Sequence, residues 1–197
     1  MEHMTKREIT QADILPLAEY VKVRKQRHAA LIAQKKHRRI EIGPVATCYF
    51  ENFDTMLHQV QEMLYIEKGG DEQIADELSA YNPMIPNGSE LTATVMFEID
   101  DPVRRKNFLS RLGGVEETMF IRFGGQEVVG VPEADVDRTN ADGKASSVQF
   151  IHFPFTGEQI AAFKSADQVL VGFSHEQYGH MAVLTEASRD ALAADFD

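Results

Sequence analysis

The sequence contains a single cysteine, Cys48, and no tryptophan. One cysteine excludes a disulfide within the chain and any zinc or iron–sulfur site built from several thiolates. Cys48 itself lies in a strand-like run and is expected to be buried and inert. No apolar run is long enough to span a membrane, and residues 1–13 have no apolar core like that of a signal peptide. We therefore expect a cytoplasmic protein.

Several motifs that would name a chemistry are also missing. The sequence has no Walker A loop, no GxGxxG and no GxSxG, so the usual phosphate-binding loops and the nucleophile elbow are not supported. Whether the protein is an enzyme stays open at this point.

Acidic charge dominates, but it is unevenly spread. The net charge is -11, which argues against nucleic acid as a partner. Residues 22–39 nevertheless carry eight Lys or Arg and no acid, so they sum to +8 and the remaining residues to -19. We expect a basic helix on an acidic body. Its Arg24, Lys25 and Arg27 are candidate contacts to an acidic surface, either on a second copy in a homo-oligomer or on another protein. Neutralisation by acids of the same chain is the alternative.

Two segments, residues 91–133 and 147–186, share one pattern of strand, helix, strand, turn and strand. The duplication predicts an α+β fold in which two βαββ units form a mostly antiparallel, pseudo-symmetric sheet or a pair of sheets. Before them, residues 1–88 read as a helical segment with short strands, because apolar residues recur at helical spacing in residues 53–67 and 71–81. The prolines of residues 82–88 mark the boundary with residues 89–197. The whole is expected to be one compact unit.

Longer stretches resemble a bacterial family known as a domain of unknown function. The resemblance lies in residues 50–69, 74–86, 93–106, 130–155 and 180–184, so that it covers nearly the whole chain. It implies a redox or peroxide-handling context, because genes of this family often neighbour those of rubrerythrin-like proteins and iron–sulfur oxidoreductases. Proteins of those two kinds are the partners that the resemblance implies. It supplies no catalytic residues.

Histidine is the one metal-ligating residue type that is concentrated in one repeat. The first repeat has none, whereas the second has His152, His175 and His180. His175 and His180 flank a predicted hairpin loop and could bind one divalent metal together. The alternative is that the loop histidines are exposed and that His152 is hydrogen-bonded in the core.

His58 and Glu62 form a second candidate, four residues apart on a predicted helix. Such a pair could bind a metal or act as an acid and base. The alternative is a solvated helix face with a weak side-chain contact.

These observations leave three functions open. The preferred interpretation is an accessory protein that binds a redox partner. A metal-binding protein or metal-dependent enzyme is the second, and a module that binds a small apolar ligand between its two repeats is the third.

Overall fold

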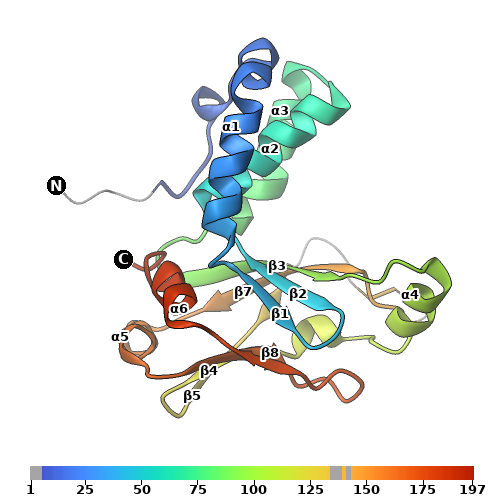
Figure 1. Cartoon of the computed structure of the whole chain (residues 1–197), viewed down its shortest axis with the longest axis vertical. Helices are drawn as coiled ribbons and strands as arrows, with labels where there is room; N and C mark the ends of the chain where they lie inside the picture. Colours follow the sequence, from blue (N-terminus) through green and yellow to red (C-terminus); the bar gives the residue numbers. More distant parts are fainter. Residues whose placement is uncertain (1–5, 134–138, 141–142) are drawn as a thin grey trace.

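The structure is a computed structural model that describes residues 6–133, 139–140 and 143–197. Three helices stand at one end of the molecule, and two antiparallel sheets lie below them, one above the other (Figure 1). The helices are α1 (Leu17–Lys35), α2 (Phe53–Glu67) and α3 (Asp71–Tyr81). We call them the helical layer.

Local signals in the sequence set the ends of these helices. α1 begins directly after Pro16, whose ring would interrupt a helix interior. Asn52 caps α2 by accepting a hydrogen bond from the backbone N–H of Thr55. α2 ends where Lys68 adopts a left-handed conformation with φ of 56°, one residue before Gly69 and Gly70.

Sheet A is the upper sheet, and its strands run in the order β1-β2-β3-β7-β6. Every neighbouring pair is antiparallel. The strands are β1 (Arg39–Ile42), β2 (Ala46–Phe50), β3 (Glu90–Phe97), β7 (Val148–Pro154) and β6 (Val131–Pro132). Because β2 pairs with β3, the two short strands before residue 88 belong to the same sheet as the strands after it.

Sheet B has the order β5-β4-β8-β9 and is also antiparallel. Its strands are β5 (Gln126–Val129), β4 (Met119–Phe123), β8 (Val169–Phe173) and β9 (Met181–Val183). Two shorter helices, α4 (Pro102–Leu109) and α5 (Gly157–Ser165), each lead from a strand of sheet A to a strand of sheet B, and α6 (Glu186–Ala193) follows β9. The 3-10 turns are Gln11–Asp13, Asn82–Met84 and Val115–Glu117. Asp101 and Thr156 cap α4 and α5 as the sequence predicts.

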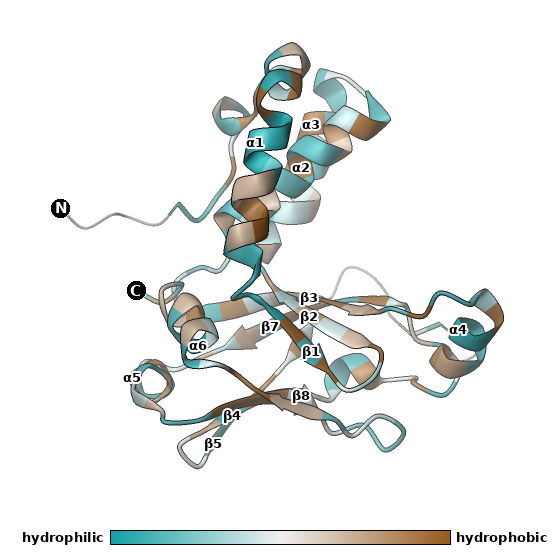
Figure 2. Cartoon of the chain, viewed as in Figure 1, coloured by the Kyte–Doolittle hydropathy of each residue, from teal (hydrophilic) through white to brown (hydrophobic). Residues whose placement is uncertain are grey.

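One hydrophobic core fills the space between the two sheets. Strands of both sheets contribute alternate side chains to it, for example Ile151 and Phe153 from β7 and Val169 and Val171 from β8. Hydrophobic residues accordingly recur along the strands of both sheets (Figure 2). An apolar ligand between the two repeats, as the third interpretation requires, would have to displace this core.

A second, smaller apolar cluster joins the helical layer to sheet A. It is made by Ile9, Met56, Val60, Met84 and Ile85, and Phe150 of β7 packs against it. Since Ile151 points into the main core, its neighbour Phe150 points to the opposite face of sheet A. The helical layer therefore rests on the outer face of that sheet.

The α+β fold with antiparallel sheets is confirmed, and both repeats contain the predicted strand, helix, strand and strand. The first strands of the repeats, β3 and β7, pair with each other in sheet A, and β4 and β8 pair in sheet B. Superposition of the repeats stays a prediction.

Candidate functional site

One side of α1 faces solvent along its whole length. The exposed fractions of Val21 and Ile32 on this side are 52% and 60%. Helical periodicity places basic and apolar side chains together there. We call this surface the α1 stripe, and its exposed residues are Val21, Lys22, Lys25, Ala29, Ile32 and Lys36.

Most of the positive charge on residues 22–39 forms no ion pair with the described residues. Three of the eight basic side chains make ion pairs: Arg24 with Glu62, Arg38 with Asp195 and Arg39 with Glu41. Among the described residues, no ion pair involves the other five, which are Lys22, Lys25, Arg27, Lys35 and Lys36. The stripe is therefore a cationic surface with exposed apolar side chains between the charges.

Arg24 faces the opposite way, into the contact between α1 and α2. Its Nε and Nη2 donate to the two carboxylate oxygens of Glu62 at 2.8 and 2.7 Å, and its guanidinium lies 4.5 Å from the ring centre of Tyr65. Tyr20 also donates its hydroxyl proton to Glu62. The hydrogen bonds from Arg24 lower the pKa of Glu62 to about 2. Arg24, expected to contact a partner, thus makes its contact within the chain.

His58 lies one turn before Glu62 on α2, but its ring neighbour comes from α1. The ring centres of His28 and His58 are 5.7 Å apart. Burial lowers the pKa of His58, so that its imidazole is neutral at pH 7. Because Arg24 and Tyr20 bind the Glu62 carboxylate, a metal held by His58 and Glu62 would have to compete with both.

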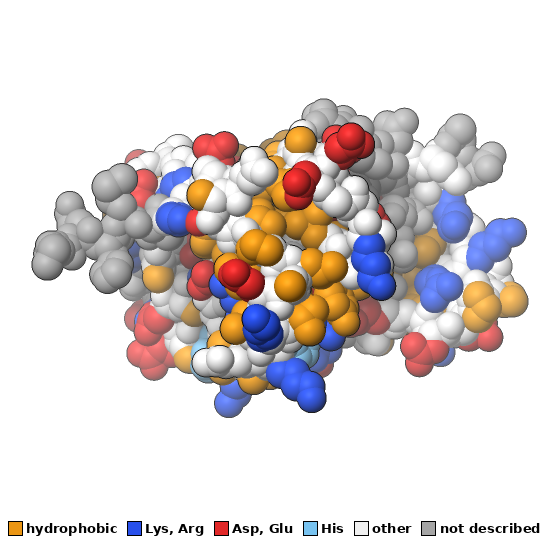
Figure 3. Space-filling view, turned by 90° about the horizontal axis from the view of Figure 1, so that it is seen from above, with side chains coloured by type: hydrophobic (Ala, Val, Ile, Leu, Met, Phe, Trp, Pro, Cys, Tyr) orange, Lys and Arg blue, Asp and Glu red, His pale blue; other side chains and the backbone are white. Residues whose placement is uncertain are grey.

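An apolar cavity of about 320 Å³ opens at the end of the helical layer far from the sheets. Viewed from that end, hydrophobic side chains surround a hollow, with charged side chains around them (Figure 3). Three segments supply its aliphatic walls: Ile14, Leu15 and Leu17 before and at the start of α1, Leu64 of α2, and Ile74 of α3. Gln11, Lys68, Gly70 and Asp71 also line it.

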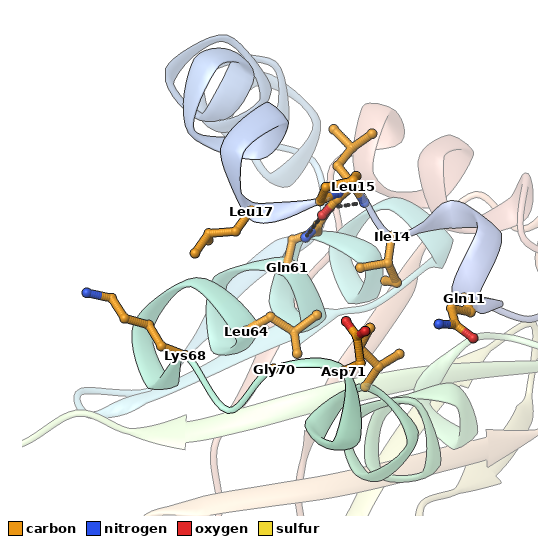
Figure 4. Close-up of a pocket in the computed structure, with 11 residues that line it drawn as sticks. Gln11, Ile14, Leu15, Leu17, Gln61, Leu64, Lys68, Gly70 and Asp71 are labelled. Atoms are coloured by element: carbon orange, nitrogen blue, oxygen red, sulfur yellow. Dashed lines mark hydrogen bonds between the residues drawn. The ribbon is translucent and has the colours of Figure 1, made fainter.

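Gln61 holds the segment before α1 in place beside the cavity (Figure 4). Its side-chain Oε1 accepts from the backbone N–H of Leu15 at 2.7 Å, and its Nε2 donates to the carbonyl of Leu15 at 3.3 Å. Since Gln61 is buried, the loss of either bond would leave an unpaired amide group in the interior. The cavity is therefore formed before any ligand binds.

His152 lies between two carboxylates on the outer face of sheet A. Its Nδ1 is 3.1 Å from Glu90 Oε2, and its Nε2 is 2.9 Å from Glu133 Oε2. Glu90, together with Glu133, raises the pKa of His152 to about 9, although partial burial opposes the charge. At pH 7 both ring nitrogens are thus protonated and donate, and a metal could bind His152 only after the ring lost a proton.

The charge of His152 should make stability depend on pH. Its pKa is raised from 6.5 to about 9 on folding, so its contribution is fully present below pH 6.5 and is lost as the pH rises through 9. We expect the wild type to lose about 3 kcal/mol of unfolding free energy over this range relative to His152→Gln. Urea denaturation of both proteins at about pH 6 and about pH 9.5 measures the difference. A difference that does not change with pH would contradict this assignment.

His175 and His180 bind separate parts of the structure. The Nδ1 of His175 accepts from the backbone N–H of Gln177 at 3.2 Å, and its Nε2 lies 3.2 Å from the carbonyl oxygen of Gly113. His180 instead contacts Tyr178 edge to face, with ring centres 4.6 Å apart, and packs on Gly43. A shared metal between them stays a prediction, which metal analysis of the purified protein would test.

Comparisons with known proteins agree with the resemblance seen in the sequence. Residues 8–196 match the model of a family described as "Protein of unknown function (DUF3501)". The chain belongs to the DUF3501 family. A crystal structure of a novel protein of unknown function from Burkholderia pseudomallei K96243 is similar to it, with 35% identity and a TM-score of 0.89. The match covers 96% of this chain and 99% of that one. No curated protein matches the chain.

Three further features of this DUF3501 protein bear on the predicted sites. Within the described ranges, no three His, Cys, Asp or Glu side chains are grouped so as to hold a metal ion. Cys48 is fully buried and burial raises the pKa of its thiol, as expected of an unreactive cysteine. No helix in the described part of the chain is long and apolar enough to cross a membrane.

The sequence did not point to two residues that the DUF3501 fold depends on. Tyr178, in the loop between the two histidines, inserts its ring between the sheets and donates its hydroxyl proton to the carbonyl of Ile42 at 2.7 Å. Gln61 of α2 is buried against Leu15, to which its side chain is hydrogen-bonded. Both partners are distant in the sequence, so no local pattern indicates either contact.

Proposed function

We propose that this protein is an accessory binding protein that docks on an acidic surface of another protein through the α1 stripe. The observation that carries the proposal is the set of exposed lysines Lys22, Lys25 and Lys36 beside the exposed Val21 and Ile32. Apolar side chains supply the area that a partner can bury, and the lysines select an acidic partner.

The positive charge of the α1 stripe also favours an acidic partner. At physiological salt the Debye length is about 8 Å. Acidic side chains farther than this from an exposed lysine therefore do little to offset its charge. Within the described residues, Lys22, Lys25 and Lys36 form no ion pair. An acidic surface that contacts all three would gain attraction and faster association.

A different protein fits this surface better than a second copy packed helix on helix. In a two-fold dimer of that kind the same patch meets itself, so the lysines of one α1 would face those of the other. Like charges at such short range oppose association. Self-association through an acidic part of the second copy is the alternative outcome of the experiment below.

The candidate partners come from the family resemblance. They are the rubrerythrin-like protein and the iron–sulfur oxidoreductase whose genes neighbour those of the family, which would place this protein in a cytoplasmic redox or peroxide-handling system. Binding of each purified partner can be measured directly by titration calorimetry.

We expect Lys22→Glu with Lys25→Glu to weaken partner binding at least tenfold at low salt, which is about 1.4 kcal/mol. The matched control is Arg104→Glu with Lys106→Glu on α4, where both side chains are also exposed. Both double variants change the net charge by -4, because each substitution replaces +1 with -1.

The control should bind as the wild type does. If both double variants weaken binding equally, total charge rather than the α1 stripe is responsible. If neither candidate partner binds and light scattering shows salt-sensitive dimers, the acidic surface belongs to a second copy and the proposal of a foreign partner is wrong.

A further inference from the structure

The apolar cavity and the α1 stripe are parts of one continuous surface. Leu17 lines the cavity and is also the first residue of α1, with an exposed fraction of 45%. Val21, one turn later, begins the stripe, and the helix rise places Ile32 about 22 Å from Leu17 along the axis. A partner segment that lies along the stripe would reach the cavity with one end.

We propose that the cavity receives one large apolar side chain from the acidic segment that lies along the α1 stripe, and so fixes the position of that segment. This inference rests on the proposed function. The partner segment would then be an acidic helix of about four turns with a Leu, Met or Phe near one end, since helices bind grooves through such anchors.

The groups around the cavity favour an apolar side chain over a charged or polar group. The buried Gln61 side chain already bonds Leu15 through both Oε1 and Nε2, so its amide is engaged within the chain. Lys68 and Asp71 at the rim have opposite charges, so the rim favours neither sign. Burial of one large apolar side chain is enough to make it a hot spot of the interface.

A phage-displayed library of 16-residue peptides, selected on the full chain, tests this inference. Synthetic copies of the selected peptides are then measured by fluorescence anisotropy. We expect them to carry several acids and one recurrent large apolar residue, whose replacement by Ala weakens binding about 10- to 100-fold.

Two isoleucines of the helical layer give a matched pair of protein variants. Ile74→Glu places a charge in the cavity wall, whereas Ile66→Glu changes a side chain on α2 that is 64% exposed and does not line the cavity. We expect the first to weaken peptide binding at least tenfold and the second to leave it within about threefold. Leu17→Asn, at the partly exposed rim, replaces Ile74→Glu if circular dichroism shows that the latter is unfolded.

The outcomes separate this inference from the proposed function. Peptides that lose affinity on Lys22→Glu with Lys25→Glu, but are insensitive to the cavity variants and to loss of their apolar residue, would overturn the anchor alone. If the charge reversal leaves the affinity of the peptides unchanged, acidic segments do not dock on α1, and the proposed anchor is wrong as well.

Discussion

Replacing Tyr178 with Ala is expected to lower the free energy of unfolding by about 3–5 kcal/mol, as for other buried aromatic residues. The ring lies between the sheets, with centre distances of 5.7, 5.7 and 5.4 Å to Phe97, Phe108 and Phe173. Its hydroxyl also accepts from the backbone N–H of Ala46 at 3.0 Å and donates to Ile42. The backbone N–H of Val45 also donates to the hydroxyl, at 3.3 Å. The substitution therefore opens a cavity and removes the hydroxyl partner of three backbone groups of the β1–β2 turn.

A second substitution separates these two effects. Tyr178→Phe keeps the ring and removes the hydroxyl, and it should cost about 1–3 kcal/mol because Ala46 then keeps a buried, unpaired N–H. Val183→Ala, at an exposed site on β9, should stay within about 0.5 kcal/mol. Urea denaturation measures all three. A loss below about 1 kcal/mol for Tyr178→Ala would mean that the ring does not hold the sheets together.

Substitution of one partner in the buried ion pair between Arg38 and Asp195 should lower the free energy of unfolding by nearly as much as Tyr178→Ala. Arg38 donates to the two carboxylate oxygens of Asp195 at 2.8 and 2.7 Å and to the carbonyl of Ala191 at 2.9 Å. The two side chains are only 6% and 7% exposed. Asp195→Ala leaves the guanidinium buried without its counter-charge, and we expect a loss of about 3–5 kcal/mol.

Removal of both charges of this ion pair should be much less destabilising than removal of one. Arg38→Met combined with Asp195→Leu should recover most of the lost stability, since apolar side chains of similar size can replace a buried ion pair. Glu127→Ala serves as a control, because it breaks the exposed Arg122–Glu127 pair and should cost less than about 1 kcal/mol. Thermal unfolding measures these losses. A larger loss of stability for Glu127→Ala than for Asp195→Ala would contradict this account.

Local chemistry explains which parts of the fold could be predicted from the sequence. Caps such as Asp101 and Thr156 act within one turn, and Gly124-Gly125 closes a hairpin because both glycines have positive φ. Alternation of apolar residues in residues 91–99 and 147–155 likewise placed β3 and β7, with Ile151 and Phe153 pointing inward.

Contacts across long sequence distances explain what could not be predicted. The charge count identified a basic helix, but not that Arg24 would turn inward to Glu62, 38 residues away. His152 was expected to bind a metal or to be hydrogen-bonded in the core, and its two carboxylate partners lie 62 and 19 residues away. The cavity is built from three separate segments, so no single stretch of sequence indicates it.

The dependence of partner affinity on salt tests the central claim most directly. Titration of the full chain with each purified candidate partner, from low to physiological salt, should show a dissociation constant that rises with ionic strength for the wild type. Lys22→Glu with Lys25→Glu should bind the partner more weakly, and its dissociation constant should depend less on salt. Arg104→Glu with Lys106→Glu should behave as the wild type does. Binding that is insensitive to salt, or equally salt-sensitive in both double variants, would contradict docking through the α1 stripe.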